Sequence, residues 1–215
     1  YRYAVSRGMG TQVQKHDDRV EIETAVHISS MSICLLAQGT VRWTVFADGR
    51  VACQADMRRE AGVPVFPRLG LRMMLPADYD KLRYFAYGPL ESYIDKRQAS
   101  LLGWHVDTVE AQYAHPLRPQ ESGSHYGARS LTLHGAQGAL RIEGAGFGFS
   151  ALNYSQEQLA DVAHDDELSC EERCVLCLDM AQRGIGSNSC GPELPACYEI
   201  ADHIQWQVML DPLAE

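Results

Sequence analysis

The feature that most constrains the fold of this chain is an alternation of apolar and polar residues with a period of two. In the stretch RVEIETAVHI, Val20, Ile22 and Val26 lie on one side, whereas charged residues lie on the other. Such alternation is typical of β-strands with one buried face. Further strands are predicted at GLRMML, KLRYFAY, WHVDTVEAQ, ARSLTLH, ALRIEG, GFGFSAL, CVLCLDM and IQWQVML. Pattern counting therefore predicts about a dozen strands, and the residues before Arg19 are taken as an opening loop.

A hairpin is predicted where two alternating runs meet at Asp48-Gly49, because a tight turn there needs positive φ. Val41 and Trp43 would line one strand, and Cys53 and Ala55 would line its partner. The three tryptophans all lie in alternating runs and are predicted to be buried: Trp43, Trp104 and Trp206.

One short helix interrupts the strands at SQEQLADVA. Ser155 and Gln158 have the spacing of a capping box, and Leu159 and Val162 would face the core, giving two or three turns. Many strands with one short helix favour an all-β fold of packed antiparallel sheets. The segment 59–70, with two prolines, is the best candidate for a linker, or else a crossover between sheets.

Charge and composition exclude some classes of partner. The net charge is −9, which disfavours nucleic acid and anionic membranes, whereas a neutral sugar remains compatible. No apolar run approaches the roughly 20 residues of a membrane-spanning helix. The seven cysteines are odd in number, and Cys174 and Cys177, three apart on a predicted strand, would face opposite sides. We therefore expect structural cysteines and no metal site.

No motif for a nucleophile triad, a phosphate loop or a dinucleotide site is present. The glycines of GAGFG at 144–148 are interpreted as kinks in a pair of strands, and His164 and Asp165 as contacts at the end of the helix. Polar clusters remain at 87–97, 118–129 and 163–168.

Five motifs, taken in order, carry a resemblance: FPRLGLRMMLP, YGPLESYIDK, RPQESGSHYGARSLTL, FSALNYSQEQLADVAHDDEL and GIGSNSCGP. Together they resemble the C-terminal, small-chain domain of β-galactosidases of glycoside hydrolase family two. The resemblance implies an antiparallel super-sandwich similar to the galactose mutarotase fold. Residues 1–64 resemble the preceding strands of that domain by pattern alone.

The resemblance also implies that catalysis depends on a different domain of the parent enzyme. The two catalytic carboxylates of the family lie in a TIM barrel elsewhere in the polypeptide, and no barrel pattern is present here. We therefore expect no catalytic residue and no cofactor in this chain, which should be inactive alone. The implied partners are the barrel domain and a galactoside. The parent enzyme, cytoplasmic or periplasmic in a bacterium, would hold Mg and Na at sites outside this chain.

The loop RGIGSNSCGP is implied to reach the sugar pocket, with Asn188, Ser189 and Cys190 as substrate-binding residues. Cys190 stands where some members have an aromatic residue, and a thiol offers no ring face for a sugar. The same residues also fit an ordinary turn without ligand contact.

Four charged residues match the family motifs, and we expect them to form buried charge pairs and turn caps: Glu91, Asp95, Glu121 and Arg129. Ser92, Lys96 and Ser122 replace residues that the family usually has, and Lys lacks the planar fork of Arg.

The chain is interpreted as one domain, 1–215, that begins inside the family domain, because a motif close to Phe-Trp-Arg-Ala-Pro-Thr-Asp-Asn is not found. Unpaired strand edges would then favour self-association, so a homo-oligomer is among the expected partners. Two alternatives remain open at this point. One is an aldose 1-epimerase-like enzyme, and the other is a stand-alone carbohydrate-binding module.

Overall fold

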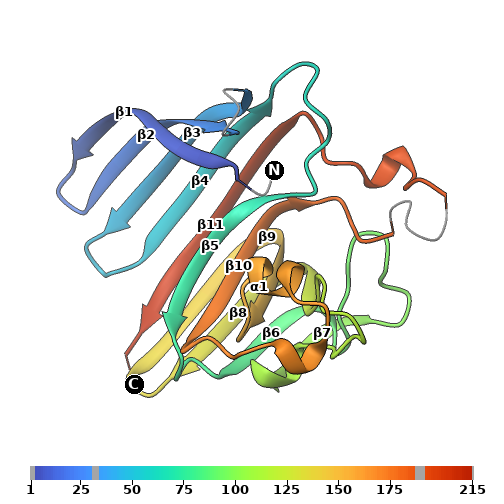
Figure 1. Cartoon of the computed structure of the whole chain (residues 1–215). Helices are drawn as coiled ribbons and strands as arrows, with labels where there is room; N and C mark the ends of the chain where they lie inside the picture. Colours follow the sequence, from blue (N-terminus) through green and yellow to red (C-terminus); the bar gives the residue numbers. More distant parts are fainter. Residues whose placement is uncertain (1–2, 31–33, 187–191, 215) are drawn as a thin grey trace.

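The computed structural model describes residues 3–30, 34–186 and 192–214, and within these it is all-β with one short α-helix (Figure 1). The strands are β1 (Val5–Lys15), β2 (Arg19–Ser29), β3 (Leu35–Phe46), β4 (Val51–Arg59), β5 (Arg68–Pro76), β6 (Lys81–Gly88), β7 (Leu101–Thr108), β8 (Ser124–Gly135), β9 (Gly138–Leu152), β10 (Arg173–Gln182) and β11 (His203–Leu213). The helices are α1 (Gln156–Asp161) and the 3-10 turns η1 (Glu110–Gln112), η2 (Asp165–Glu167) and η3 (Ala196–Tyr198). All strand pairs among the described residues are antiparallel, which confirms the predicted all-β antiparallel fold with one short helix.

The strands form two layers that share β8 and β9. The long layer has the order β1-β2-β3-β4-β11-β9-β8-β6-β7, whereas β10 pairs with β9 and β5. The first part of β9, 139–144, pairs with β11, and its last part, 148–152, pairs with β10. The short layer therefore consists of β5, β10 and the adjoining ends of β9 and β8. Figure 1 shows β5 and β10 side by side.

The core lies between these layers. Cys53 of β4, Val208 of β11, Leu176 of β10 and Tyr84 of β6 are all almost fully buried in one apolar cluster. Alternate residues of β5 pack against the same cluster from the edge of the short layer. The alternation read from the sequence thus corresponds to inward-facing side chains of both layers.

The predicted hairpin and helix are confirmed. Trp43 lies opposite Cys53 in the β3–β4 pair, and Gly49 has a φ of 91°. Ser155 and Gln158 form the capping box of α1. The helix is shorter than the two or three turns predicted, because the backbone is extended at Val162.

Two predictions about the strands were wrong. The opening loop is largely β1, which the pattern missed because all its residues are exposed and it carries two glycines at a register shift. ALRIEG and GFGFSAL are not two strands but the single strand β9. Its glycines lie at the bend where β9 passes from one layer to the other, and the pairing with β8 shifts register there.

The prediction of three core tryptophans was correct for Trp206, whereas Trp43 is half-buried. It was wrong for Trp104, which is 52% exposed. The reason is that β7 is an edge strand whose outer face no other element covers in the described residues. The guanidinium of Arg83 lies 4.2 Å from the centre of the Trp104 ring and shields part of it.

The segment 59–70 is not a linker between domains. It connects β4 to β5, and Val63 and Phe66 from it are buried in the core. Cys174 and Cys177 lie on β10, as predicted, and burial raises the pKa of these thiols to about 12 and about 11. In the described ranges, no group of three or more potential ligands is arranged to hold a metal ion. No helix in those ranges combines the length and the apolar character needed to cross a bilayer.

Candidate functional site

The candidate site is the base of the loop that follows β10, where several of the resemblance motifs meet. The carboxylate of Asp95 accepts hydrogen bonds from the backbone N–H of Ile185 at 3.3 Å and of Gly186 at 2.8 Å. Gly184 has a φ of 93°, and a Cβ at this position would collide with the Asp95 carboxylate. Glycine is therefore required at position 184 for two reasons: the backbone has a positive φ, and the Asp95 carboxylate leaves no room for a Cβ.

The predicted substrate-binding residues Asn188, Ser189 and Cys190 lie outside the described residues. The adjoining residues on the β10 side are described, and the segment 183–186 runs beside the motif at 87–97. The structure thus brings Asp95, from the motif YGPLESYIDK, into contact with the base of the loop that contains the motif GIGSNSCGP.

Glu91 caps the neighbouring turn. It accepts hydrogen bonds from Lys96 Nζ at 2.6 Å, from the Gly123 N–H at 3.1 Å and from the Tyr93 hydroxyl at 3.3 Å. Burial opposes ionisation of Glu91, but these donors outweigh it, so the pKa of Glu91 is lowered. Lys96 contacts Glu91 through a single nitrogen, without the two-pronged geometry of an arginine.

Two serines that replace family residues are also buried and satisfied. Ser92 Oγ donates to the Tyr87 carbonyl at 2.9 Å and accepts from the Tyr126 N–H at 2.9 Å. Ser122 Oγ accepts from the Ala114 N–H at 3.0 Å. These hydroxyls hold the two loops against the start of β8.

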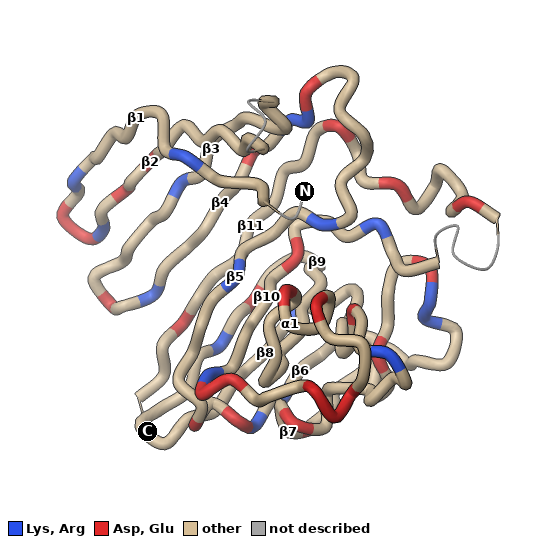
Figure 2. Tube along the Cα trace, viewed as in Figure 1, with Lys and Arg blue, Asp and Glu red and all other residues tan. Residues whose placement is uncertain are grey.

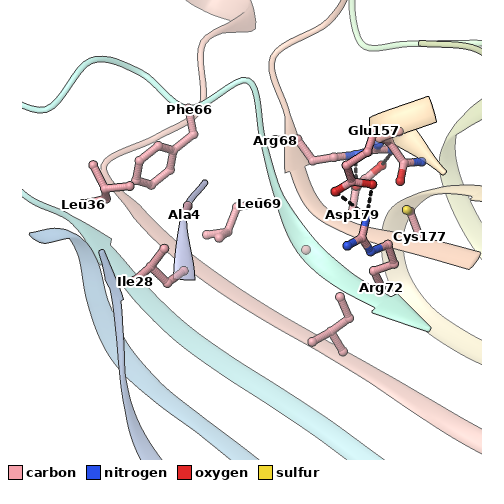
Figure 3. Close-up of a pocket in the computed structure, with 13 residues that line it drawn as sticks. Ala4, Ile28, Leu36, Phe66, Arg68, Leu69, Arg72, Glu157, Cys177 and Asp179 are labelled. Atoms are coloured by element: carbon pink, nitrogen blue, oxygen red, sulfur yellow. Dashed lines mark hydrogen bonds and ion pairs between the residues drawn. The ribbon is translucent and has the colours of Figure 1, made fainter. Parts of the chain in front are cut away.

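Beneath the loops lies an ion network that joins the two edges of the short layer. Arg68 of β5 binds Asp179 of β10 through two hydrogen bonds, 2.6 Å and 2.9 Å (Figure 3). Arg68 also reaches Glu121 at 3.2 Å. Only 2% of the Asp179 side chain is exposed. Gln182 donates to the second oxygen of Glu121 at 3.4 Å.

The electrostatics of this network follow from its burial. Burial raises the pKa of Glu121, and the nearby Arg68 offsets only part of the effect. The pKa of Arg68 is raised, because attraction to Asp179 and Glu121 exceeds the burial penalty. Arg68, Asp179 and Gln182 were missed by sequence reasoning, although a charged residue inside an apolar strand is itself a signal.

Arg129 differs from the other three predicted residues. It is exposed on β8, and no ion pair with it occurs among the described residues, so it is not part of a buried charge pair. The exposed position follows from strand alternation, because its neighbour Ala128 faces the core.

His164 and Asp165 follow α1 and lie at the start of the turn η2. Asp165 accepts from His115 Nδ1 at 3.0 Å, which lowers the pKa of Asp165, and His164 precedes the turn η2. Figure 2 shows acidic residues gathered along α1 and the segment after it. This acidic surface is distinct from the loop base.

One buried histidine lies close to the Glu91 turn. His125 of β8 lies between the Tyr87 carbonyl, 3.0 Å from Nδ1, and the Gln112 side-chain oxygen, 2.5 Å from Nε2. Gln112 in turn donates to Asp107 at 2.7 Å. Burial lowers the pKa of His125 to about 4, so the ring is neutral at neutral pH.

A cavity of about 410 Å³ adjoins the loop base. Its lining includes polar and aromatic side chains: Ser124, Tyr126, Asp179, Gln182, Tyr198 and Glu199. The carboxylates of Glu91, Asp95, Glu121 and Asp179 all have donors. The arrangement therefore supports the base of the loop.

The fold and the site define a class: an antiparallel β-domain in which the carboxylate of Asp95 holds the base of a glycine-rich loop. Comparison with known proteins then gives the family. Residues 3–210 match the model described as "Beta galactosidase small chain", and the chain belongs to this family. It is 33% identical over 202 residues to a β-galactosidase of Actinobacillus pleuropneumoniae and 32% identical over 212 residues to one of Staphylococcus xylosus.

These matches cover 94% and 98% of this chain, but only 20% and 21% of the relatives. A β-galactosidase of an Arthrobacter species (strain B7) is 38% identical over 138 residues, which are 60% of this chain and 14% of that protein. The chain thus spans about one fifth of the length of the curated relatives that it matches along its whole length.

Proposed function

We propose that residues 1–215 are the small-chain region of a multidomain β-galactosidase that hydrolyses terminal β-D-galactosides. The match to the small-chain family along residues 3–210, together with relatives about five times as long, supports this assignment. In this proposal the catalytic carboxylates lie in a TIM-barrel domain outside residues 1–215. The region supplies part of the wall of the sugar pocket and is inactive alone.

The observation that carries the role of this region is the clamp of Asp95 on Ile185 and Gly186. It holds the described base of the loop against the motif at 87–97. We place Asn188 and Ser189 at sugar hydroxyls, as hydrogen-bond partners, and Cys190 beside them.

Other features of the parent enzyme belong to the same proposal. Mg and Na ions would bind outside residues 1–215, and the enzyme would work in the cytoplasm or periplasm of a bacterium. In the same proposal, the exposed edge strand β1 pairs with a second copy of the protein and forms a homo-oligomer.

The test compares two purified proteins: residues 1–215 and the complete polypeptide encoded by the gene that contains them. The complete polypeptide is expected to hydrolyse nitrophenyl β-galactoside, whereas residues 1–215 alone are expected to show no rate above buffer. Cleavage by residues 1–215 alone, or an inactive complete polypeptide that is folded, would contradict the proposal.

The epimerase alternative is not favoured, because the family match is to β-galactosidases. One observation bears on a carbohydrate-binding module, namely the exposed Trp104. Arg83 shields part of its ring, and we expect no heat of binding when residues 1–215 are titrated with galactose or lactose. Measurable binding that the Trp104→Ala variant abolishes would restore this alternative.

A further inference from the structure

The strand β7 forms one end of the long layer, and its outer edge is open. Among the described residues, β7 pairs only with β6 (Figure 1). An edge strand carries unpaired backbone N–H and C=O groups, and natural proteins commonly protect such an edge with lysine, proline or a bulge. The sequence of β7, LLGWHVDT, contains neither lysine nor proline, and its pairing with β6 has no register shift. The edge is therefore a template for a further strand.

The side chains on the outer face of β7 are apolar and exposed. Leu102 is 42% exposed, Trp104 is 52% exposed and Val106 is 77% exposed. The three share one face because side chains alternate along a strand. Phe85 of β6 lies opposite Trp104, with the ring centres 5.5 Å apart, and continues this apolar face inward. Contiguous exposed apolar side chains beside an open strand edge indicate a contact surface.

The order of residues along β7 selects a second copy of the same strand as the occupant. Two copies related by a two-fold axis pair antiparallel, so the outer face of one continues into the outer face of the other. In the register centred on Trp104, this residue lies opposite the Trp104 of the second copy, and Leu102 lies opposite its Val106. Every exposed residue of the outer face then has an apolar neighbour. The register centred on His105 is poorer, because it places Leu102 opposite Thr108.

Charge and size are compatible with this pairing. Asp107 is the only Asp, Glu, Lys or Arg of β7, and it lies opposite Leu101 of the second copy in the register centred on Trp104. The guanidinium of Arg83 lies 4.2 Å from the centre of the Trp104 ring. The centre of the contact thus combines tryptophan and arginine, which are enriched among the residues that dominate binding energy. Pairing buries on the order of 1,000 Å² in total, about the size at which specific interfaces begin.

We propose that the complete polypeptide forms a two-fold contact in which β7 pairs antiparallel with β7 of a second copy, in the register centred on Trp104. The two long layers then form one continuous sheet across the axis. Since β1 and β7 are opposite ends of the long layer, this contact is additional to the pairing of β1 proposed above. It does not depend on the proposed galactosidase activity, because β7 contributes none of the carboxylates that hold the loop base.

Cysteine cross-linking tests the register. The Trp104→Cys variant of the complete polypeptide is expected to form a disulfide-linked dimer with oxidised glutathione, because Cβ atoms directly opposite each other lie about 4.5–5.5 Å apart. Leu102→Cys should not link to itself, since the two positions lie roughly 14 Å apart along the strands. It should link to Val106→Cys when both are co-expressed. The control is the protein without these substitutions, which keeps its own exposed cysteines. Self-linking of Leu102→Cys as efficient as its linking to Val106→Cys contradicts the proposed register.

The mass of the particle in analytical ultracentrifugation provides the second readout. Trp104→Lys places a charge at the centre of the contact, whereas Ser130→Lys places the same charge on the same face, two strands inward. Trp104→Lys is expected to halve the mass of the complete polypeptide's particle, and Ser130→Lys should leave it unchanged. Circular dichroism of both variants verifies that they are folded. An unchanged mass for folded Trp104→Lys overturns the proposal, also where another domain of the polypeptide covers β7. An enzymatically inactive polypeptide that shows the mass difference refutes the proposed activity but supports the contact.

Discussion

The buried ion pair between Arg68 and Asp179 gives the sharpest prediction about stability. Replacement of Arg68 with Met removes the partner of a carboxylate that is only 2% exposed and is held by two hydrogen bonds. Loss of one partner of a buried pair typically costs 3–5 kcal/mol, because the other charge stays buried, so we expect a loss of about 4 kcal/mol. For a chain of this size, that corresponds to a fall in melting temperature of roughly 8–16 °C.

Arg72 provides a matched control on the same strand. Its ion pair with Glu157 is exposed, with 44% and 49% of the two side chains accessible, and pairs of that kind contribute about 0–1 kcal/mol. Urea unfolding of both Arg→Met variants, followed by fluorescence at constant m-value, measures the difference. Equal destabilisation by the two substitutions would refute the reasoning, since burial would then not decide the cost.

Three further predictions concern the site. Gly184→Ala should destabilise the chain more than Gly62→Ala in urea unfolding. Both glycines have positive φ, which costs roughly 1–2 kcal/mol for alanine, but only Gly184 also meets Asp95. Asp95→Ala in the complete polypeptide should raise KM for nitrophenyl galactoside several-fold more than Asp166→Ala, because only Asp95 holds the loop base; equal KM values would contradict that role. His125 is expected to make stability depend on pH. Its pKa is about 4 when folded and 6.5 when unfolded, so the unfolded chain binds the proton more readily. Stability should therefore fall by about 3 kcal/mol as pH drops from 6.5 to 4, and His125→Gln should remove that component.

Sequence patterns predicted the strands that have one buried and one exposed face. They failed for β1, which is exposed on both faces. The β3–β4 hairpin was predicted because Trp43 and Cys53 alternate with polar residues, whereas β1 has no buried residue to mark it. The sequence pattern also does not show whether a strand lies at the edge or in the middle of its sheet. For this reason Trp104, on the edge strand β7, was wrongly predicted to be in the core. Alternation shows which side chains share a face, but not whether anything covers that face.

The candidate site was predicted in part. Glu91, Asp95 and Glu121 came from ordered motifs, and the structure joins each to a donor. Their partners Arg68 and Gln182 lie 53 and 61 residues from Glu121, and pairing at that separation depends on strand order. Arg129 shares a motif with Glu121 and yet faces solvent, since one position along a strand reverses the direction of a side chain.

The sharing of β8 and β9 between the layers has a mechanical consequence. Two sheets held together only by side chains can slide or part while each stays intact. Here separation would break backbone hydrogen bonds in the ladders that β9 forms with β8, β10 and β11, on both sides of the bend at 144–148. A force applied to the loop after β10 therefore passes from β10 to β9, and the continuous main chain of β9 carries it to β11. A cut in the peptide chain at that bend should abolish folding of both layers together.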